Sequence, residues 1–180
     1  MKKKLISITL SFEDKFNNKL LKCWSILKNQ YKIKYISSRS KKPHISLLSG
    51  YVNSTNKIIN ILTKKDTKPF YLNTRGLGLF FSEKPLLYIR WQQNKDIIDL
   101  YKVLDKELNL FFIEKNSHTK FSNWIPKTTL AYKDLKFKDL KKIEKKLRFI
   151  NIEKKVLIKK IDLMVVDEKK GEKILFTKSL

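Results

Sequence analysis

A five-residue pattern that occurs twice constrains this chain more than any other feature. Pro43-His44-Ile45-Ser46-Leu47 returns 83 residues later as Pro126-Lys127-Thr128-Thr129-Leu130. Each copy leads into an apolar-periodic helix, then a strand, a charged turn and another strand. The repeat predicts an α+β fold, duplicated about a pseudo-two-fold axis within a single bilobal domain that spans residues 1–180.

Hydrophobic periodicity predicts the remaining elements. Strands are expected over 4–10, through the two motifs (the second starting at residue 125), and over 70–81, 86–91, 155–166 and 173–179. Helices are expected over 14–27, from residue 54 or 56 to 64, over 94–108 as the longest, and from about residue 137. Residues 32–42 have isolated basic and hydroxyl residues and are expected as a strand end and an exposed loop. Residues 112–123 lack periodicity and are expected as a polar loop that carries His118. Between Ile158 and Ile161 the apolar phase shifts, which indicates a bulge or burial on both faces.

The two motifs place basic and hydroxyl side chains together. Side chains two residues apart on a strand point to the same face, so His44 lies beside Ser46 and Lys127 beside Thr129. A basic group next to a hydroxyl suits a phosphate. The composition agrees with an anionic partner, because 41 Lys and Arg against 17 Asp and Glu give a net charge of +24. Only four of these basic residues are arginines, however, and such a lysine-rich bias also arises from AT-rich codons.

Other features exclude several classes of protein. The single Cys23 rules out an internal disulfide and a multi-cysteine metal site. No apolar run is long enough to cross a bilayer, and hydroxyls interrupt the apolar residues 5–10, which therefore predict a first strand rather than a signal peptide. We expect a cytoplasmic protein that is a monomer, needs no obligate protein partner, and uses neither metal nor cofactor.

The chemistry that suits such a site is cleavage of a phosphodiester or cyclic phosphate. One group removes a proton from the attacking oxygen, another donates one to the leaving oxygen, and two histidines do this near neutral pH. Hydroxyls two residues on can bond the non-bridging oxygens, where charge accumulates. With this pattern the chain resembles the two-histidine phosphoesterase superfamily, which includes bacterial 2'-5' RNA ligase-like (LigT-like) proteins and cyclic phosphodiesterases.

This resemblance implies two antiparallel sheets around a central cleft, with helices outside. It also implies that His44 and residue 127 form the acid–base pair, while Ser46 and Thr129 hold the phosphate. The substrate would be an RNA end, a 2',3'-cyclic phosphate or a 2'-5' linkage. The first motif fits the family pattern fully, whereas the second has Lys127 in place of histidine.

The replacement leaves three alternatives. Lys127 acts as general acid or electrostatic clamp with His44 as base, or His118 substitutes for the missing histidine, or catalysis is lost and a nucleotide- or RNA-binding module remains. Lysine normally titrates far above neutrality, and burial or neighbouring positive charge would lower its pKa.

Three further residues are candidates for substrate binding. Tyr88 and Arg90 share one face of their predicted strand, opposite Leu87, Ile89 and Trp91. If the second face packs on helices, Tyr88 and Arg90 enter the cleft. Tyr132, directly after the second motif, could stack on a base, or it could belong to the core or its rim.

Overall fold

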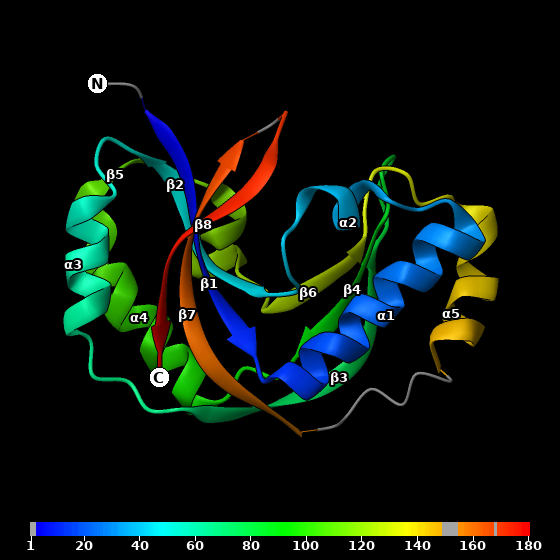
Figure 1. The fold of residues 1–180 in the computed structure, drawn as a ribbon, viewed down its shortest axis with the longest axis horizontal. Coiled ribbons are helices and arrows are strands. Elements are labelled where there is room, and N and C mark those ends of the chain that lie inside the picture. Colours follow the sequence, from blue (N-terminus) through cyan, green and yellow to red (C-terminus); the bar gives the residue numbers. More distant parts are fainter. Residues whose placement is uncertain (1–2, 149–154, 168) are drawn as a thin grey trace.

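The structure is a computed structural model that describes residues 3–148, 155–167 and 169–180. Two lobes lie side by side, with strands between them and helices toward their outer sides (Figure 1). The elements are β1 (Lys4–Phe12), α1 (Asp14–Tyr31), α2 (Tyr35–Arg39), β2 (Ile45–Val52), α3 (Asn56–Lys64), β3 (Phe70–Phe80), β4 (Leu86–Trp91), α4 (Lys95–Leu108), β5 (Phe112–Lys115), β6 (Lys127–Ala131), α5 (Leu140–Arg148), β7 (Lys155–Asp167) and β8 (Gly171–Ser179). Short 3-10 turns occupy Asn109–Phe111, Ser117–Thr119, Phe121–Asn123 and Phe137–Asp139.

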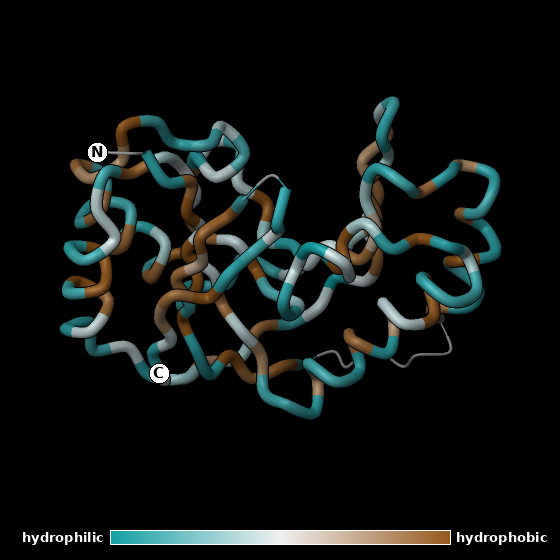
Figure 2. Tube along the Cα trace, turned by 45° about the horizontal axis from the view of Figure 1, so that its top comes forward, coloured by the Kyte–Doolittle hydropathy of each residue, from teal (hydrophilic) through white to brown (hydrophobic). Residues whose placement is uncertain are grey.

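The strands form an antiparallel path in the order β5-β2-β1-β7-β3-β4-β6, with β8 paired to β7. We call β5, β2, β1, β7 and β8 with α3 and α4 the first lobe, and β3, β4 and β6 with α1 and α5 the second lobe (Figure 1). The long strands β3 and β7 pair over Phe70–Asn73 and join the two. Hydrophobic stretches of the trace run along the strands and the inner faces of the helices (Figure 2).

Each motif strand lies among elements of the other repeat. Strand β2, after the first motif histidine, packs against α4 and is joined through β1 to the hairpin β7–β8. Strand β6, which carries the second motif, pairs with β4 and packs against α1. The first repeat thus contributes α1 and the hairpin β3–β4 to the surroundings of β6, and the second contributes α4 and the hairpin β7–β8 to those of β2. This exchange places the two motif strands close to each other in the middle of the molecule.

The core explains why the helices form where they do. In α1 the buried side chains recur at helical spacing, and the helix ends where Lys32 takes a left-handed conformation with φ 61°. One of these side chains, Phe16, packs edge-on against Trp91 of β4 at 5.6 Å between ring centroids. The buried residues of α1 are Phe16, Leu20, Cys23, Trp24 and Leu27.

Four expectations about the elements need correction. The longest helix in the described chain is α1 with 18 residues, not α4 with 14. Residues 112–123 contain β5 and two 3-10 turns, and β6 begins at Lys127 rather than at residue 125. Residues 32–42 contain α2, because Asp134 Oδ2 accepts the backbone N–H groups of Lys34 and Tyr35, both at 2.7 Å. The carboxylate that caps α2 lies 100 residues away in the sequence from Lys34, so local periodicity does not predict this helix.

Both explanations of the phase shift in β7 apply. Ser11 pairs with Lys160 while Phe12 pairs with Ile158, so Lys159 is an extra residue in a bulge. Beyond it, residues 161–164 are all buried. No helix in the described part of the chain has the length and apolar character needed to cross a membrane.

Candidate active site

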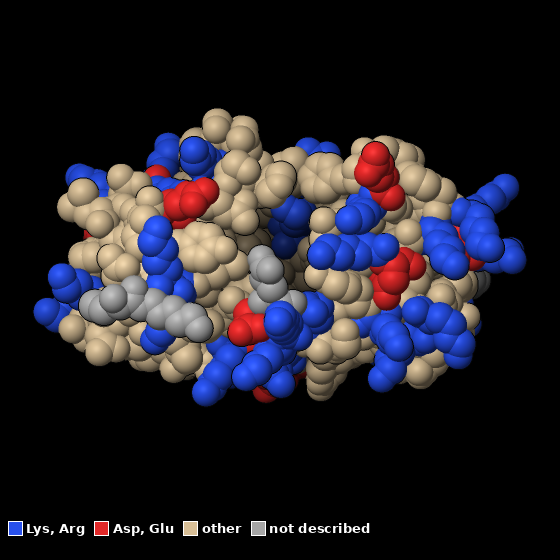
Figure 3. Space-filling model, turned by 90° about the horizontal axis from the view of Figure 1, so that it is seen from above, with Lys and Arg blue, Asp and Glu red and all other residues tan. Residues whose placement is uncertain are grey.

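A cavity of about 300 Å³ lies between the lobes and contains residues of both motifs. Seen from above, the molecule is hollowed between its lobes, and basic side chains reach into the hollow (Figure 3). This is the arrangement that the paired motifs predict. The lining residues that carry polar or ionisable groups are Ser7, Trp24, Ser40, His44, Ser46, Ser49, Asn116, His118, Thr119, Trp124, Lys127, Thr129 and Glu172.

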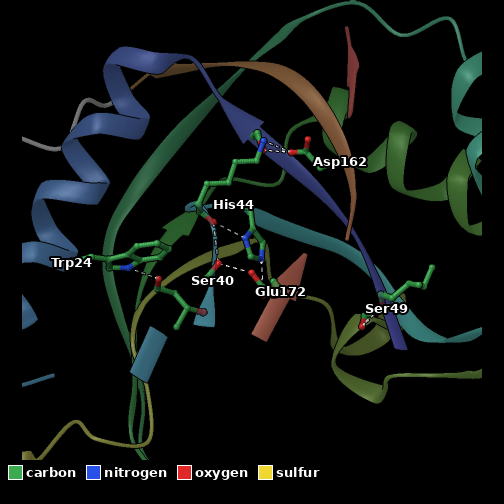
Figure 4. A network of polar contacts seen from close by, with 10 residues as sticks. Trp24, Ser40, His44, Ser49, Asp162 and Glu172 are labelled. Carbon is green, nitrogen blue, oxygen red and sulfur yellow. Dashed lines mark hydrogen bonds and ion pairs between the residues drawn. The ribbon is translucent and has the colours of Figure 1, made fainter. Parts of the chain in front are cut away.

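The imidazole of His44 is held from its Nδ1 side. It lies directly before β2, and its Nδ1 is 3.0 Å from the carbonyl oxygen of Lys42 (Figure 4). A carbonyl only accepts hydrogen bonds, so Nδ1 carries the proton and donates it. In the neutral ring Nε2 is then unprotonated. It is the nitrogen that can accept a proton from a bound molecule, and it lies 3.9 Å from Glu172 Oε1.

A buried carboxylate fixes the segment that carries His44. The Lys42 ammonium lies 2.7 Å from Asp162 Oδ2, and the side chain of Asp162 is completely buried (Figure 4). The same carboxylate accepts hydrogen bonds from the hydroxyls of Ser11 and Thr177. The residue that orients the imidazole is therefore anchored to the middle of β7.

Removing this carboxylate is expected to destabilise the protein. Asp162→Ala would leave the Lys42 ammonium and two hydroxyls without their partner, so the free energy of unfolding should fall by about 3 kcal/mol. Urea unfolding followed by far-UV circular dichroism measures the loss. Asp99→Ala, which removes one partner of an exposed pair with Lys95, serves as control and should change little. Equal effects of the two substitutions would contradict the anchoring role of Asp162.

Glu172 is a cavity residue that the sequence did not reveal. It follows Gly171, whose φ of 82° allows the turn into β8, and its Oε2 accepts a hydrogen bond from Ser40 Oγ at 2.5 Å. Its other oxygen faces His44. No motif marks Glu172, because only the pairing of β8 with β7 brings it to the cavity.

Lys127 stands at the start of β6 and is partly buried. Burial lowers its pKa below the usual range for lysine. Its Nζ lies 5.7 Å from the ring centroid of Phe80, in a cation–π contact. Among the described residues, no carboxylate pairs with Lys127 and no hydrogen-bond acceptor contacts its ammonium. The charge is thus available to an anion in the cavity.

The motif hydroxyls are equally available. Within the described ranges, neither Ser46 Oγ nor Thr129 Oγ1 has a hydrogen-bond partner, although both residues line the cavity. Their backbones are held by two tryptophans. Trp124 Nε1 donates to the carbonyl oxygen of Ser46 at 2.9 Å, and Trp24 Nε1 donates to that of Thr129 at 3.3 Å. The tryptophans were not predicted as site residues, because each is far in sequence from the carbonyl that it binds.

His118 also lines the cavity. It lies in the 3-10 turn Ser117–Thr119, where its backbone N–H donates to Asn116 Oδ1 at 3.0 Å. Thr119 ties this turn to β2, because its hydroxyl accepts the backbone N–H of Ser49 at 3.1 Å. A second imidazole is therefore present beside the motif residues, and the substitute-histidine alternative keeps a structural basis.

The expectation that Tyr88 and Arg90 enter the cleft needs correction. Leu87, Ile89 and Trp91 are buried, as expected, and Tyr88 and Arg90 lie opposite Thr129 and Lys127 in the β4–β6 pair. Neither side chain lines the cavity, however. Phe80 stacks on Tyr88 at 4.8 Å and covers it, while Arg90 is exposed in a separate hollow.

Tyr132 does not line the cavity either. Its ring packs edge-on against Tyr35 at 5.9 Å, and the ammonium of Lys133 lies 5.8 Å from it. The ring of Tyr132 therefore packs outside the cavity and does not stack on a base inside it.

Solved structures resemble this one over its whole length. E. coli LigT in its apo form gives a TM-score of 0.61 at 14% sequence identity, covering 100% of this chain and 99% of LigT. LigT in complex with 3'-AMP gives a TM-score of 0.61 at 12% identity, with the same coverage. Usb1 of Kluyveromyces marxianus gives 0.53 at 9% identity, covering 98% of each chain. No protein-family model matches the sequence, and no curated protein sequence does.

These similarities confirm the fold that the resemblance implies. The chain has the α+β, bilobal fold of LigT.

Proposed function

We propose that this protein is a metal-independent phosphodiesterase of the two-histidine type, acting on RNA ends, 2',3'-cyclic phosphates or 2'-5' linkages. The observation that carries the proposal is the meeting of His44, Ser46, Lys127 and Thr129 in one cavity between the lobes. The fold shared with LigT, a protein solved with 3'-AMP bound, supports a nucleotide phosphate as ligand.

His44 is the general base in this proposal. With Nδ1 donating to the Lys42 carbonyl, the free Nε2 can take a proton from the attacking water or ribose hydroxyl. Glu172, 3.9 Å from Nε2, then faces the imidazolium that forms and stabilises its charge.

Lys127 is the general acid, placed on the opposite motif strand. Its ammonium has no carboxylate partner among the described residues, so it can contact the phosphate and pass a proton to the leaving oxygen. Burial lowers its pKa, which makes the ammonium a stronger acid than an exposed lysine. As the P–O bond breaks, the leaving oxygen gains the Nζ proton while the attacking oxygen gives its proton to His44.

The two motif hydroxyls complete the site by donating to the non-bridging oxygens, where negative charge grows. We expect Ser46→Ala and Thr129→Ala each to lower kcat by about ten- to a thousandfold, because each removes one donor to that charge. Thr63→Ala is the control and should keep full activity, because the exposed Thr63 hydroxyl only donates to the Ile59 carbonyl within α3. Steady-state kinetics on one cyclic phosphate measures all three. Unchanged kcat in both motif variants would contradict the assigned role.

The direct test of the proposal is turnover by the purified protein. It is incubated with nucleoside 2',3'-cyclic phosphates and with 2'-5'-linked oligonucleotides in the presence of a chelator, and products are separated by chromatography. Hydrolysis that persists in chelator is the expected result. Lack of turnover on every substrate, or turnover abolished by the chelator, would contradict the proposal.

One observation favours a second candidate, a nucleotide- or RNA-binding module without catalysis. Lys127 occupies the position of the second family histidine, and a lysine can hold a phosphate as a fixed cation without moving a proton. The binding module predicts nucleotide affinity with no turnover. Kinetics and binding measured on the same preparation separate the two candidates.

A further inference from the structure

A second hollow adjoins the cavity and is lined by two of the four arginines in the sequence. It has a volume of about 590 Å³ and lies beside the point where the chain enters β6. Ile125 lines both this hollow and the cavity, so the two are neighbours. We call it the arginine hollow; its lining residues are Arg75, Arg90, Trp91, Gln92, Gln93, Ile125 and Pro126.

A bulge in β3 brings the two arginines together. Thr74 pairs with Trp91 and Leu77 with Ile89, so Arg75 and Gly76 both lie opposite Arg90. Gly76 has a φ of 80°, a conformation that glycine adopts without strain. Two like charges are thus opposed across neighbouring strands, which destabilises a sheet unless an anion lies between them.

Nothing in the described part of the chain neutralises these guanidinium groups. No acidic residue lines the arginine hollow, and neither Arg75 nor Arg90 has an ion-pair or hydrogen-bond partner among the described residues. Lysine supplies nearly all other positive charge of this protein, so the arginines stand out. A guanidinium differs from an ammonium by its planar fork, which binds phosphate oxygens in pairs.

The arginine hollow also has a fixed relation to the proposed reaction site. Arg90 is the register partner of Lys127 in the β4–β6 pair, so the two residues are on one face of adjacent strands. An anion bound by Arg90 on β4 would therefore lie one strand away from a phosphate bound by Lys127 on β6. A nucleic acid strand presents phosphates in such a series, whereas a mononucleotide has only one.

We propose that the arginine hollow binds the internal phosphodiester next to the reacting phosphate, so that the substrate is an oligonucleotide rather than a mononucleotide. This inference rests on the proposed function, because it assumes a phosphate in the cavity. Arg75 and Arg90 contact the neighbouring phosphate and take no part in proton transfer.

Binding of two product-like ligands tests the inference. Uridine 3'-phosphate carries only the terminal phosphate, and the dinucleotide UpUp adds one internal phosphodiester. We expect UpUp to bind the wild-type protein about tenfold more tightly, and a methylphosphonate at the internal linkage to remove that gain. Arg75→Gln and Arg90→Gln should also remove it, while leaving the affinity for uridine 3'-phosphate unchanged. Calorimetric titration gives all the dissociation constants.

Two matched variants sharpen the test. Lys106→Gln removes one positive charge from the exposed side of α4, in the first lobe, and should affect neither ligand. Arg90→Lys keeps the charge but not the fork, and should restore only part of the gain. The salt dependence of UpUp binding gives a further check, because the slope of log Kd against log salt grows with the number of phosphates that the protein neutralises. A variant that loses one phosphate contact should have a slope lower than that of the wild type by about 0.7.

The outcomes distinguish this inference from the proposed function. Two results would overturn the proposed role of the arginine hollow, even if the protein hydrolyses cyclic phosphates. The first is that the wild type binds UpUp and uridine 3'-phosphate with equal affinity. The second is that Arg75→Gln and Arg90→Gln weaken the binding of both ligands by the same factor. Arginine-dependent binding of UpUp without any turnover would support the hollow and contradict the phosphodiesterase.

Discussion

Replacing His44 with alanine is expected to lower kcat/KM for a nucleoside 2',3'-cyclic phosphate by about a hundred- to ten-thousandfold, because the variant lacks the proposed general base. The remaining cavity would still hold Lys127, Ser46 and Thr129, so the loss should fall mainly on kcat rather than on KM. Initial rates over a range of substrate concentrations separate the two parameters.

His118→Ala is the matched comparison, since it removes the other imidazole from the same cavity. We expect it to have little effect, with the wild-type fold of both variants checked by circular dichroism. A loss as large as that at His44 would instead make His118 the second acid–base group. Full activity in His44→Ala would move the chemistry away from the first motif altogether.

Lys127 gives the second large effect. Lys127→Ala should reduce kcat by about a hundred- to ten-thousandfold, because it removes the proton donor. Lys127→His should retain or raise activity near neutral pH, because an imidazole there restores the two-histidine pair. Both variants are assayed on the same cyclic phosphate as the wild type.

The pH dependence of activity tests whether residue 127 donates the proton, because a purely structural role of this residue would leave the pH dependence unchanged. A proton donor must be protonated, so activity falls as pH rises through its pKa. In the wild type this alkaline limb should lie below the usual lysine range, since burial lowers the pKa of Lys127. In Lys127→His it should shift further, to about pH 6.5. An unshifted limb would show that residue 127 is not the proton donor.

The binding module predicts a different result at the same residue. The wild type would then show no turnover, and Lys127→Ala would weaken nucleotide binding and flatten its dependence on salt. A wild type with neither turnover nor nucleotide affinity would contradict both functions. In that case the net charge of +24 would reflect composition bias alone.

The sequence predicts the parts of the site that are repeated. Two short motifs, in which side chains two residues apart share a face, were enough to indicate that His44 and Lys127 share a cavity with two hydroxyls. This was possible because the alternation of side chains along a strand is regular and the motif occurs twice. The faces of β4 were also predictable, since burial of Leu87 and Ile89 leaves Arg90 on the other side.

What the sequence does not predict depends on contacts between distant segments. Glu172 and Trp24 reach the site through contacts across the molecule, and no motif lies near them in the sequence. Trp124 directly precedes the second motif, but the Ser46 carbonyl to which it donates belongs to the first motif, 78 residues away. Arg90 shows a related difficulty: its face was predicted, but not that a bulge at Arg75 would create a hollow beside the cavity. A register shift of one residue in β3 leaves no sign in hydrophobic periodicity.

The exchange of helices and hairpins between the repeats means that neither half of the chain can form a motif site by itself. A cut in the segment between β4 and α4 would leave β2 on one fragment, separated from α4 and from the hairpin β7–β8. The other fragment would keep β6 and lose α1, with Trp24 and its bond to Thr129. The duplicated sequence is therefore not a pair of interchangeable modules, and assembling the cavity is the same cooperative event as folding the whole chain.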